Sequence, residues 1–310
     1  MLAQIKTAIK RLPLVADMVA KRRSARLTMS SVEENMWAVP AGHYYSPIPS
    51  LDEVRKDEEH IFGSVPSHLA GIELREEEQL ALLDEFVAYY GEMPFEAHPR
   101  EDLRYYYENQ SYAYSDGIFL HCMIRHLKPR RVIEVGSGFS SCMTLDTNDL
   151  FFDGSIRTTF IDPYPELLMS LVRDVDRSRI EVIASRLQDV DPAVFGALQA
   201  NDILFIDSTH VSKINSDVNR IFFAILPMLA RGVHVHFHDI FFPFEYPKAW
   251  IYGGRAWNEA YLLRAFLQYN NAFRIVLMNT FLEHFYEPFF REKMPLCLRN
   301  TGGSIWIRKE

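Results

Sequence analysis

The chain has 310 residues, is 48% hydrophobic and carries a formal net charge of −8 at pH 7. A chain of this length can bury a full core, and its acidic balance argues against a general nucleic-acid binder, which would present a basic surface. The cysteines, Cys122, Cys142 and Cys297, form no Cys-x-x-Cys pair, which argues against a disulfide scaffold or cysteine zinc site and favours a reducing cytoplasm.

The first 30 residues are basic within an otherwise acidic chain, with seven Lys or Arg against the single acid Asp17. No small-residue cleavage site follows a long apolar core, and no apolar run reaches the roughly 20 residues of a membrane span. A basic amphipathic helix can bind an anionic membrane surface peripherally. The interpretation that we favour is a helix docked on the protein or a loose terminus.

Residues 1–110 predict a helical N-terminal extension, because helix-like segments and irregular connections fill them. Residues 73–90 form the clearest helix, with one apolar face made of Leu80, Leu83, Phe86, Val87 and Tyr90. A second helix is expected from Ser115, its N-cap, to just before Pro129.

From residue 131 the pattern changes to an alternation of strands and helices, which predicts an α/β domain over residues 111–310. Short runs rich in Val, Ile and Phe occupy residues 131–137, 156–165, 179–185, 202–209 and 232–239. Such runs, separated by helical segments, indicate right-handed βαβ units and a buried parallel sheet. A helix at 257–270 and two strands, at 273–282 and 302–310, complete the domain.

Ligands of such sheets bind at the carboxyl ends of the strands, so the residues after each strand are candidates for a site. The first strand holds Glu134 and leads into Gly136 and Gly138, while Ser141 stands where a dinucleotide fingerprint has its third glycine. Asp162 follows the second strand, where a carboxylate can bind ribose hydroxyls; the alternative is a simple Asp-Pro turn.

After the third strand, Gln188 and Asp189 can hydrogen-bond an exocyclic amine, although Asp189 can equally cap a helix.

The stretches "VIEVGSGFSS", "FIDPYPE", "LQDV" and "DILFIDSTH", in this order, resemble motifs I to IV of class I S-adenosylmethionine-dependent methyltransferases. The resemblance runs from about residue 112 to the end and is to a bacterial branch often found among sugar and polysaccharide genes. It implies a Rossmann-like, seven-stranded, mostly parallel sheet with an antiparallel last strand. It also implies cofactor-binding roles for Glu134, Gly136, Ser137, Gly138, Asp162, Gln188 and Asp189.

The missing third glycine agrees with this cofactor. S-adenosylmethionine has no pyrophosphate to place at a helix N-terminus, so the packing role of that glycine is dispensable. The cofactor carries an ammonium and a sulfonium instead, and acids such as Glu134 and Asp207 can help to offset these charges.

Methyl transfer to a hydroxyl requires alignment and removal of a proton, so a base or a metal is expected. Asp207 and His210 follow the fourth strand, and His238 and Asp239 end the fifth. The ends of neighbouring parallel strands converge, so these side chains are expected around one reacting hydroxyl.

This set also resembles the magnesium-dependent sugar O-methyltransferases of macrolide biosynthesis. The resemblance implies that His210 is the base, with Asp207 and Asp239 as catalytic residues that hold a divalent ion. His238 departs from that pattern as a third candidate ligand. Magnesium prefers oxygen donors, whereas imidazole suits zinc, iron or manganese-type sites, so the ion, Mg or Mn, is left open.

His234 and His236 share a strand face with His238. They should lie within the sheet body, and we expect them to be satisfied core histidines rather than metal ligands.

Residues 240–257 are rich in aromatics and broken by prolines and glycines. They predict either a lid that stacks on a ring-shaped acceptor or a structural loop, and Tyr246, Trp250 and Arg255 are not ranked within it.

Together these features predict a cytoplasmic methyltransferase with a small-molecule or glycan acceptor, which methylates a hydroxyl of a sugar or glycan intermediate. One alternative is a nucleotide-dependent oxidoreductase, but neither a third glycine nor a Tyr-x-x-x-Lys pair is evident. The other is a non-catalytic module that contacts membranes or proteins through its basic N-terminus. The oligomeric state is left open.

Overall fold

A computed structural model describes residues 38–310. The chain divides into two compact units, one ending at Ile61 and one spanning Phe62–Glu310. In the described part of the first unit, α3 (Leu51–Lys56) begins after Ser50, whose side chain accepts a hydrogen bond from the Glu53 N–H. Helix α4 (Glu58–Phe62) follows, and its last residue, Phe62, is the first of the second unit. The predictions made for residues 1–30 lie outside the described residues. Within residues 38–310, no helix is long and apolar enough to cross a membrane.

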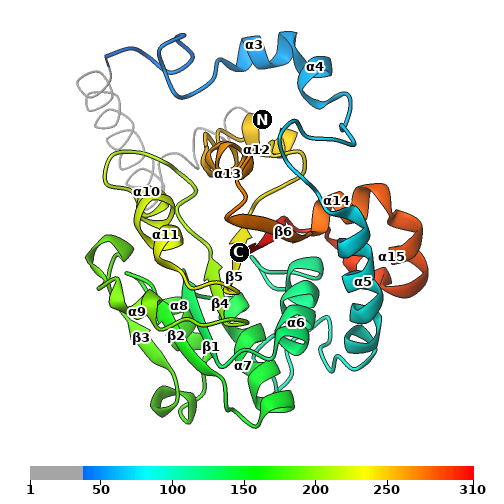
Figure 1. The fold of residues 1–310 in the computed structure, drawn as a ribbon, viewed down its shortest axis with the longest axis vertical. Coiled ribbons are helices and arrows are strands. Elements are labelled where there is room, and N and C mark those ends of the chain that lie inside the picture. Colours follow the sequence, from blue (N-terminus) through cyan, green and yellow to red (C-terminus); the bar gives the residue numbers. More distant parts are fainter. Residues whose placement is uncertain (1–37) are drawn as a thin grey trace, which may run out of the picture. The chain divides into compact units, whose positions relative to one another are not determined.

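The second unit is built on a seven-stranded sheet with the order β3-β2-β1-β4-β5-β7-β6 (Figure 1). The first five strands pair in parallel, whereas β7 lies antiparallel between β5 and β6. This arrangement confirms the predicted fold class. The strands are β1 (Arg131–Val135), β2 (Arg157–Ile161), β3 (Glu181–Ile183), β4 (Ile203–Ile206), β5 (His234–His238), β6 (Phe273–Met278) and β7 (Ser304–Lys309).

Helices cover the sheet, so its central strands are buried on both faces. All four residues of β4 and all five of β5 are buried, which explains the continuous apolar run in β4. The helices are α5 (Glu76–Gly91), α6 (Ser115–Leu127), α7 (Phe139–Phe152), α8 (Glu166–Leu171), α9 (Ala193–Gly196), α10 (Asp217–Arg220), α11 (Leu226–Met228), α12 (Lys248–Tyr252), α13 (Glu259–Leu267), α14 (Asn279–Phe285) and α15 (Glu287–Lys293).

The predicted N-cap of α6 and the predicted end of β6 are wrong, because the side chains of Ser115 and Asn279 form hydrogen bonds with residues distant in the sequence. Ser115 is the first residue of α6 rather than its N-cap, and its hydroxyl donates to Glu283 instead. The expected strand at 273–282 ends at Met278, where Asn279 begins α14. The Asn279 side-chain oxygen accepts from the backbone N–H of Ser304, at 2.8 Å, and this ties the helix start to β7.

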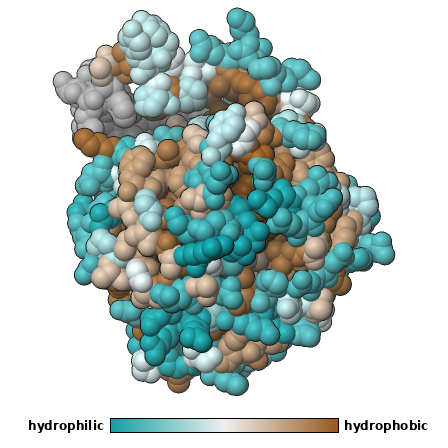
Figure 2. Space-filling model, viewed as in Figure 1, coloured by the Kyte–Doolittle hydropathy of each residue, from teal (hydrophilic) through white to brown (hydrophobic). Residues whose placement is uncertain are grey.

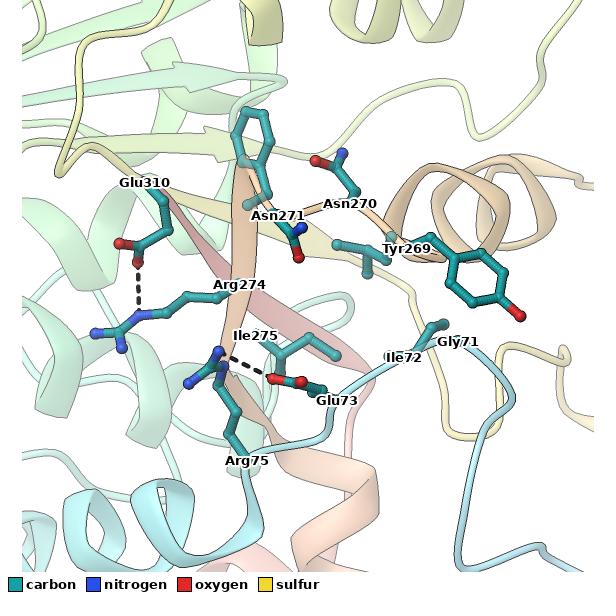
Figure 3. Close-up of a pocket in the computed structure, with 12 residues that line it drawn as sticks. Gly71, Ile72, Glu73, Arg75, Tyr269, Asn270, Asn271, Arg274, Ile275 and Glu310 are labelled. Atoms are coloured by element: carbon teal, nitrogen blue, oxygen red, sulfur yellow. Dashed lines mark hydrogen bonds and ion pairs between the residues drawn. The ribbon is translucent and has the colours of Figure 1, made fainter.

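Residues 62–110 belong to the same compact unit as the sheet, so the unit begins well before residue 111. Helix α5 buries Leu82, Leu83 and Phe86, and its Gln79 side chain accepts a hydrogen bond of 2.8 Å from the Met278 N–H. Residues 62–110 of the predicted extension therefore pack with the sheet, and Figure 3 shows Glu73 and Arg75 lining a pocket together with residues of β6.

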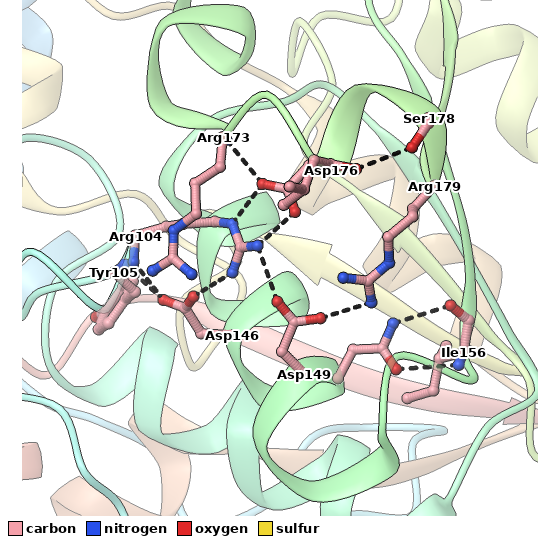
Figure 4. Close-up of polar contacts among 11 residues, drawn as sticks. Arg104, Tyr105, Asp146, Asp149, Ile156, Arg173, Asp176, Ser178 and Arg179 are labelled. Atoms are coloured by element: carbon pink, nitrogen blue, oxygen red, sulfur yellow. Dashed lines mark hydrogen bonds and ion pairs between the residues drawn. The ribbon is translucent and has the colours of Figure 1, made fainter.

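Arg104 ties this segment to the helices that follow β1 and β2 (Figure 4). Its side chain is 2% exposed and forms ion pairs with Asp146, Asp149 and Asp176. The Arg104 N–H also donates to Asp146, at 2.7 Å. One guanidinium thus holds three carboxylates, of which Asp146 and Asp176 are buried.

The surface seen in Figure 2 mixes hydrophilic and hydrophobic residues. Exposed apolar side chains of the second unit include Tyr164, Ile214 and Phe223. Exposed apolar residues are ordinary on protein surfaces and do not by themselves mark a site.

Candidate cofactor and acceptor site

A cleft of about 480 Å³ lies at the carboxyl ends of β1, β2 and β4. Residues that follow four different strands line it: Gly136 and Ser137 after β1, Asp162 after β2, Gln188 after β3, and Asp207 after β4. The parallel sheet brings these strand ends to one edge, as the sequence predicted. Glu134, Gly138 and Asp189 are not among the lining residues.

A glycine is required at position 136 because the ends of β1 and β4 approach each other closely there. Its φ is +84°, and a Cβ atom there would lie 2.4 Å from the backbone oxygen of Asp207. A side chain would therefore separate the ends of β1 and β4. Gly138 has an extended φ of 168°, and a Cβ there would meet only Leu167, at an ordinary 3.4 Å.

Ser141, which stands at the position of the third glycine, forms two hydrogen bonds through its hydroxyl. Its hydroxyl accepts from the Gly138 N–H at 3.0 Å and donates to Glu134 Oε1 at 2.9 Å. Ser140 donates to the same carboxylate oxygen at 2.6 Å. The two serines at the start of α7 thus orient Glu134.

Glu134 is fully buried, and its second oxygen, Oε2, has no hydrogen-bond partner within residues 38–310. Burial raises the pKa of Glu134 to about 8, and the negative charges of Asp207 and Asp162 act in the same direction. A buried carboxylate with an orphaned oxygen is stabilised by a cation. The residues present therefore fit the ammonium of S-adenosylmethionine.

We expect ligand binding to release a proton from Glu134 near pH 7. The carboxyl is mostly protonated when its pKa is about 8, and an ammonium beside it favours the ionised form, which lowers the pKa. Calorimetric titration with S-adenosylhomocysteine in two buffers of different ionisation enthalpy measures this release. Glu134→Gln should abolish the buffer dependence, and an unchanged dependence in that variant would place the proton elsewhere.

Asp162 is both a turn former and a cleft residue. Its Oδ1 accepts from the Tyr164 N–H at 2.8 Å, so the turn alternative is realised, and its Oδ2 accepts from the Ser137 hydroxyl at 2.7 Å. Both contacts hold the carboxylate at the edge of the cleft.

After β3, the two polar candidates diverge. Gln188 lines the cleft and donates to the backbone oxygen of Asn215 at 2.8 Å. Asp189 instead accepts two hydrogen bonds from Arg186, at 2.8 and 3.0 Å. A local ion pair thus engages Asp189, and the structure does not bring it into the cleft.

Asp162→Ala should weaken the binding of S-adenosylhomocysteine by about 10-fold or more, because charge-assisted hydrogen bonds are lost. Asp189→Ala is the matched control and should leave the affinity unchanged, since its carboxylate faces Arg186. Calorimetry on both variants measures the difference. Equal affinities for the wild type and Asp162→Ala would remove Asp162 from the site.

The acceptor-side candidates converge around His210, as expected. Its Nε2 lies 3.3 Å from Asp207 Oδ1 and 3.7 Å from Asp239 Oδ2. The backbone φ angles of His210 and Asp239 are +59° and +57°, in the left-handed region. Such conformations are rare for residues other than glycine and often occur at functional sites.

Glu259 is a further member of this cluster. It is the first residue of α13 and is fully buried, and its Oε2 accepts from His210 Nδ1 at 2.9 Å. The Ser208 hydroxyl lies 2.9 Å from both of its oxygens. Burial alone would lower the pKa of His210, but its hydrogen bonds to Asp207 and Glu259 raise it to about 10.

The predicted metal site does not fit this geometry. In the described residues, no group of three or more His, Cys, Asp or Glu side chains is arranged to hold an ion. The Nε2 of His210 faces both Asp207 and Asp239, and His238 Nε2 lies 3.5 Å from Asp239. Imidazole nitrogens thus contact the carboxylates that we expected to bind the metal, and we derive no step through one.

His234 and His236 lie inside the sheet, as predicted, but they are not satisfied. The His234 Nδ1 and both ring nitrogens of His236 have no hydrogen-bond partner among the described residues. Burial lowers the pKa of His234 to about 3 and that of His236 well below its usual value. His236 stacks on Phe205 with ring centroids 4.2 Å apart, which indicates a neutral core residue.

In the aromatic segment at 240–257, some side chains are buried in the protein and others lie beside His210. Tyr246 is buried, and its hydroxyl accepts from the Ala260 N–H at 3.1 Å, so its role is structural. Trp257, which we did not single out, lies 4.3 Å from the His210 ring. Trp250 packs against Trp257 at 5.4 Å, with Arg255 over its ring.

The antiparallel β7 between β5 and β6, together with the glycine turn and acids at the strand ends, defines a class I S-adenosylmethionine-dependent methyltransferase. Residues 133–240 match a family model described as a methyltransferase domain. The chain is 36% identical over 167 residues to a protein of Archaeoglobus fulgidus named only as uncharacterized, across 53% of this chain and 75% of that one. The chain belongs to this methyltransferase family.

Solved structures with similar folds include two methyltransferases. One is the S-adenosylhomocysteine-bound PaMTH1 of Podospora anserina, 13% identical, with a TM-score of 0.42 over 88% of this chain and 99% of that one. The other is the O-methyltransferase TomG of Streptomyces achromogenes, 15% identical, with a TM-score of 0.41 over 63% of this chain and 79% of that one.

Proposed function

We propose that this methyltransferase transfers a methyl group to a hydroxyl of a sugar or glycan intermediate. The observation that carries the proposal is His210, whose Nδ1 is held by Glu259 and whose Nε2 faces the carboxylates of Asp207 and Asp239. His210, Asp207, Asp239 and Glu259 form an acid–base cluster. Asp207 also lines the cleft, so it belongs to both the cleft and this cluster. A cytoplasmic location is part of the proposal.

The cofactor, when bound, supplies a methyl group activated by its sulfonium. On the protein side, Glu134 would receive the ammonium, Asp162 the ribose hydroxyls, and Gln188 the adenine. Asp207 is the acid best placed for the positive charge near the reacting carbon, because it both lines the cleft and contacts His210.

In this proposal, His210 removes the proton of the acceptor hydroxyl at Nε2. Glu259 keeps the other nitrogen protonated, which fixes the orientation of the ring and makes the neutral imidazole a stronger base. The raised pKa of His210 means that the ring must first lose a proton, so the active form becomes more abundant as pH rises. Asp239 would then accept a hydrogen bond from the new imidazolium at Nε2.

The first test is calorimetric titration with S-adenosylhomocysteine, with NAD as the control and with magnesium or manganese present or absent. Binding of S-adenosylhomocysteine alone supports the cofactor assignment and justifies a screen of sugar acceptors with radiolabelled methyl donor. Binding of NAD alone, or of neither ligand, contradicts the proposal. A metal-dependent gain in affinity would show that a divalent ion joins the site and that the proposal, which uses none, is incomplete.

A further inference from the structure

Arg255 lies on the turn that follows α12, and backbone hydrogen bonds hold this turn beside the acid–base cluster. The Arg255 N–H donates to the Trp250 backbone oxygen at 3.0 Å. A few residues later, the N–H groups of Asn258 and Glu259 both donate to the backbone oxygen of His210, at 3.0 and 3.1 Å. The segment that carries Arg255 is thus tied directly to the residue proposed as the base.

Two tryptophan rings support the Arg255 guanidinium. Its central carbon lies 4.1 Å from the ring centroid of Trp250 and 5.3 Å from that of Trp257. The two rings are nearly perpendicular, at 82°, and Trp257 in turn lies 4.3 Å from the ring of His210. Arg255 is therefore separated from the proposed base by one aromatic ring. Stacking engages the face of the guanidinium and leaves its N–H edge available.

Across residues 38–310, no carboxylate lies within ion-pair distance of the Arg255 guanidinium, and the side chain is exposed. Burial raises the pKa of Asp239, and the charge of Arg255 is among the influences that oppose this rise. By contrast, the exposed Arg186 pairs with Asp189 only three residues away.

A planar guanidinium with a free N–H edge is suited to bidentate binding of a carboxylate or phosphate. The acceptor region holds the acids Asp207, Asp239 and Glu259 around His210, whose pKa of about 10 keeps its ring protonated at pH 7. Arg255, which is exposed beside this cluster, adds a second cation and therefore bears on which acceptors can bind.

We propose that Arg255 determines acceptor specificity by binding an oxyanion of the acceptor, so that the substrate is an acidic or phosphorylated sugar rather than a neutral one. This inference rests on the proposed function, since it names the class of acceptor for the same site. Carboxylate and phosphate share the chemistry that Arg255 recognises, and the experiment separates them.

The test uses the intrinsic fluorescence of the full-length protein loaded with S-adenosylhomocysteine, because two of its four tryptophans flank Arg255. The probes are D-glucuronate, D-glucose 1-phosphate and, as the neutral control, D-glucose, each titrated to millimolar concentration. At least one anion should bind more tightly than glucose, and the tighter anion identifies the source of the oxyanion.

Arg255→Met should weaken binding of that anion by about 10- to 100-fold, because hydrogen bonds to a charged group are lost. The affinity of Arg255→Lys for that anion should lie between those of the wild type and Arg255→Met, since lysine keeps the charge but lacks the planar guanidinium. Both variants should bind S-adenosylhomocysteine as the wild type does.

The inference is overturned if glucose binds as well as the anions, if no anion binds, or if Arg255→Met binds the anion unchanged. Retained binding of S-adenosylhomocysteine in those cases leaves the proposed function standing. Failure of the wild type to bind S-adenosylhomocysteine overturns the proposed function, and the inference with it.

Discussion

His210→Ala should lower the turnover of methyl transfer by about 100-fold or more, the usual contribution of a general base, while the affinity for S-adenosylhomocysteine stays nearly unchanged. The imidazole contacts Asp207, Asp239 and Glu259 but is not among the residues that line the cofactor cleft. Single-turnover rates with radiolabelled methyl donor measure the first effect, and calorimetry measures the second. His126→Ala is a control, because His126 pairs with Glu85 away from the site.

The pH dependence tests the same assignment. Because the pKa of His210 is raised to about 10, the neutral base is scarce at pH 7, and the wild-type rate should rise with pH. Glu259→Gln removes one of the negative charges that raise this pKa, so the rising limb should shift to lower pH. An unshifted limb in that variant, or a turnover in His210→Ala equal to that of the wild type, would show that another group takes the proton.

Arg104→Met should lower the free energy of unfolding by about 3–5 kcal/mol, as expected when one partner of a buried ion pair is removed. The substitution leaves Asp146 and Asp176 buried without their cation, as the contacts in Figure 4 indicate. Urea denaturation measures the loss. Arg100→Met is the matched control and should change stability little, because Arg100 pairs with exposed acids at the surface.

The destabilisation should depend on pH in a defined direction. Burial acts to raise the pKa of Asp176, but its hydrogen bonds to Arg104 outweigh burial and lower it. A lowered pKa adds stability above the pKa of the unfolded chain, and this stability is lost as pH falls through the folded value. The difference between the wild type and Arg104→Met should therefore shrink in acid. Equal losses for Arg104→Met and Arg100→Met at neutral pH would contradict the buried network.

Most of the sheet could be predicted from sequence, because each parallel strand is a short run containing Val, Ile or Phe and leaves a local signal, although only β4 and β5 are buried throughout. The same signal located Gly136, Asp162, Asp207 and His210, since ligands of parallel sheets bind at the carboxyl ends of strands. The position of Asp189 after the third strand also predicted it as a cofactor-binding residue, but the sequence did not show that it would form an ion pair with the nearby Arg186. Local competition between side chains is not visible in a motif.

Contacts between residues distant in sequence were decided only by the tertiary structure. Glu259 lies 49 residues from His210 in the chain, and nothing in an acid at a helix start reveals which ring it will contact. Arg104 likewise meets Asp146 and Asp176 at separations of 42 and 72 residues. The sequence by itself therefore determined the methyltransferase class, through the resemblance of its strand-end motifs to that family, and the positions of most strand ends, because these follow from local patterns. Packing alone decided the partner of His210 and the placement of Arg255, since both depend on how α12 and α13 lie against the sheet.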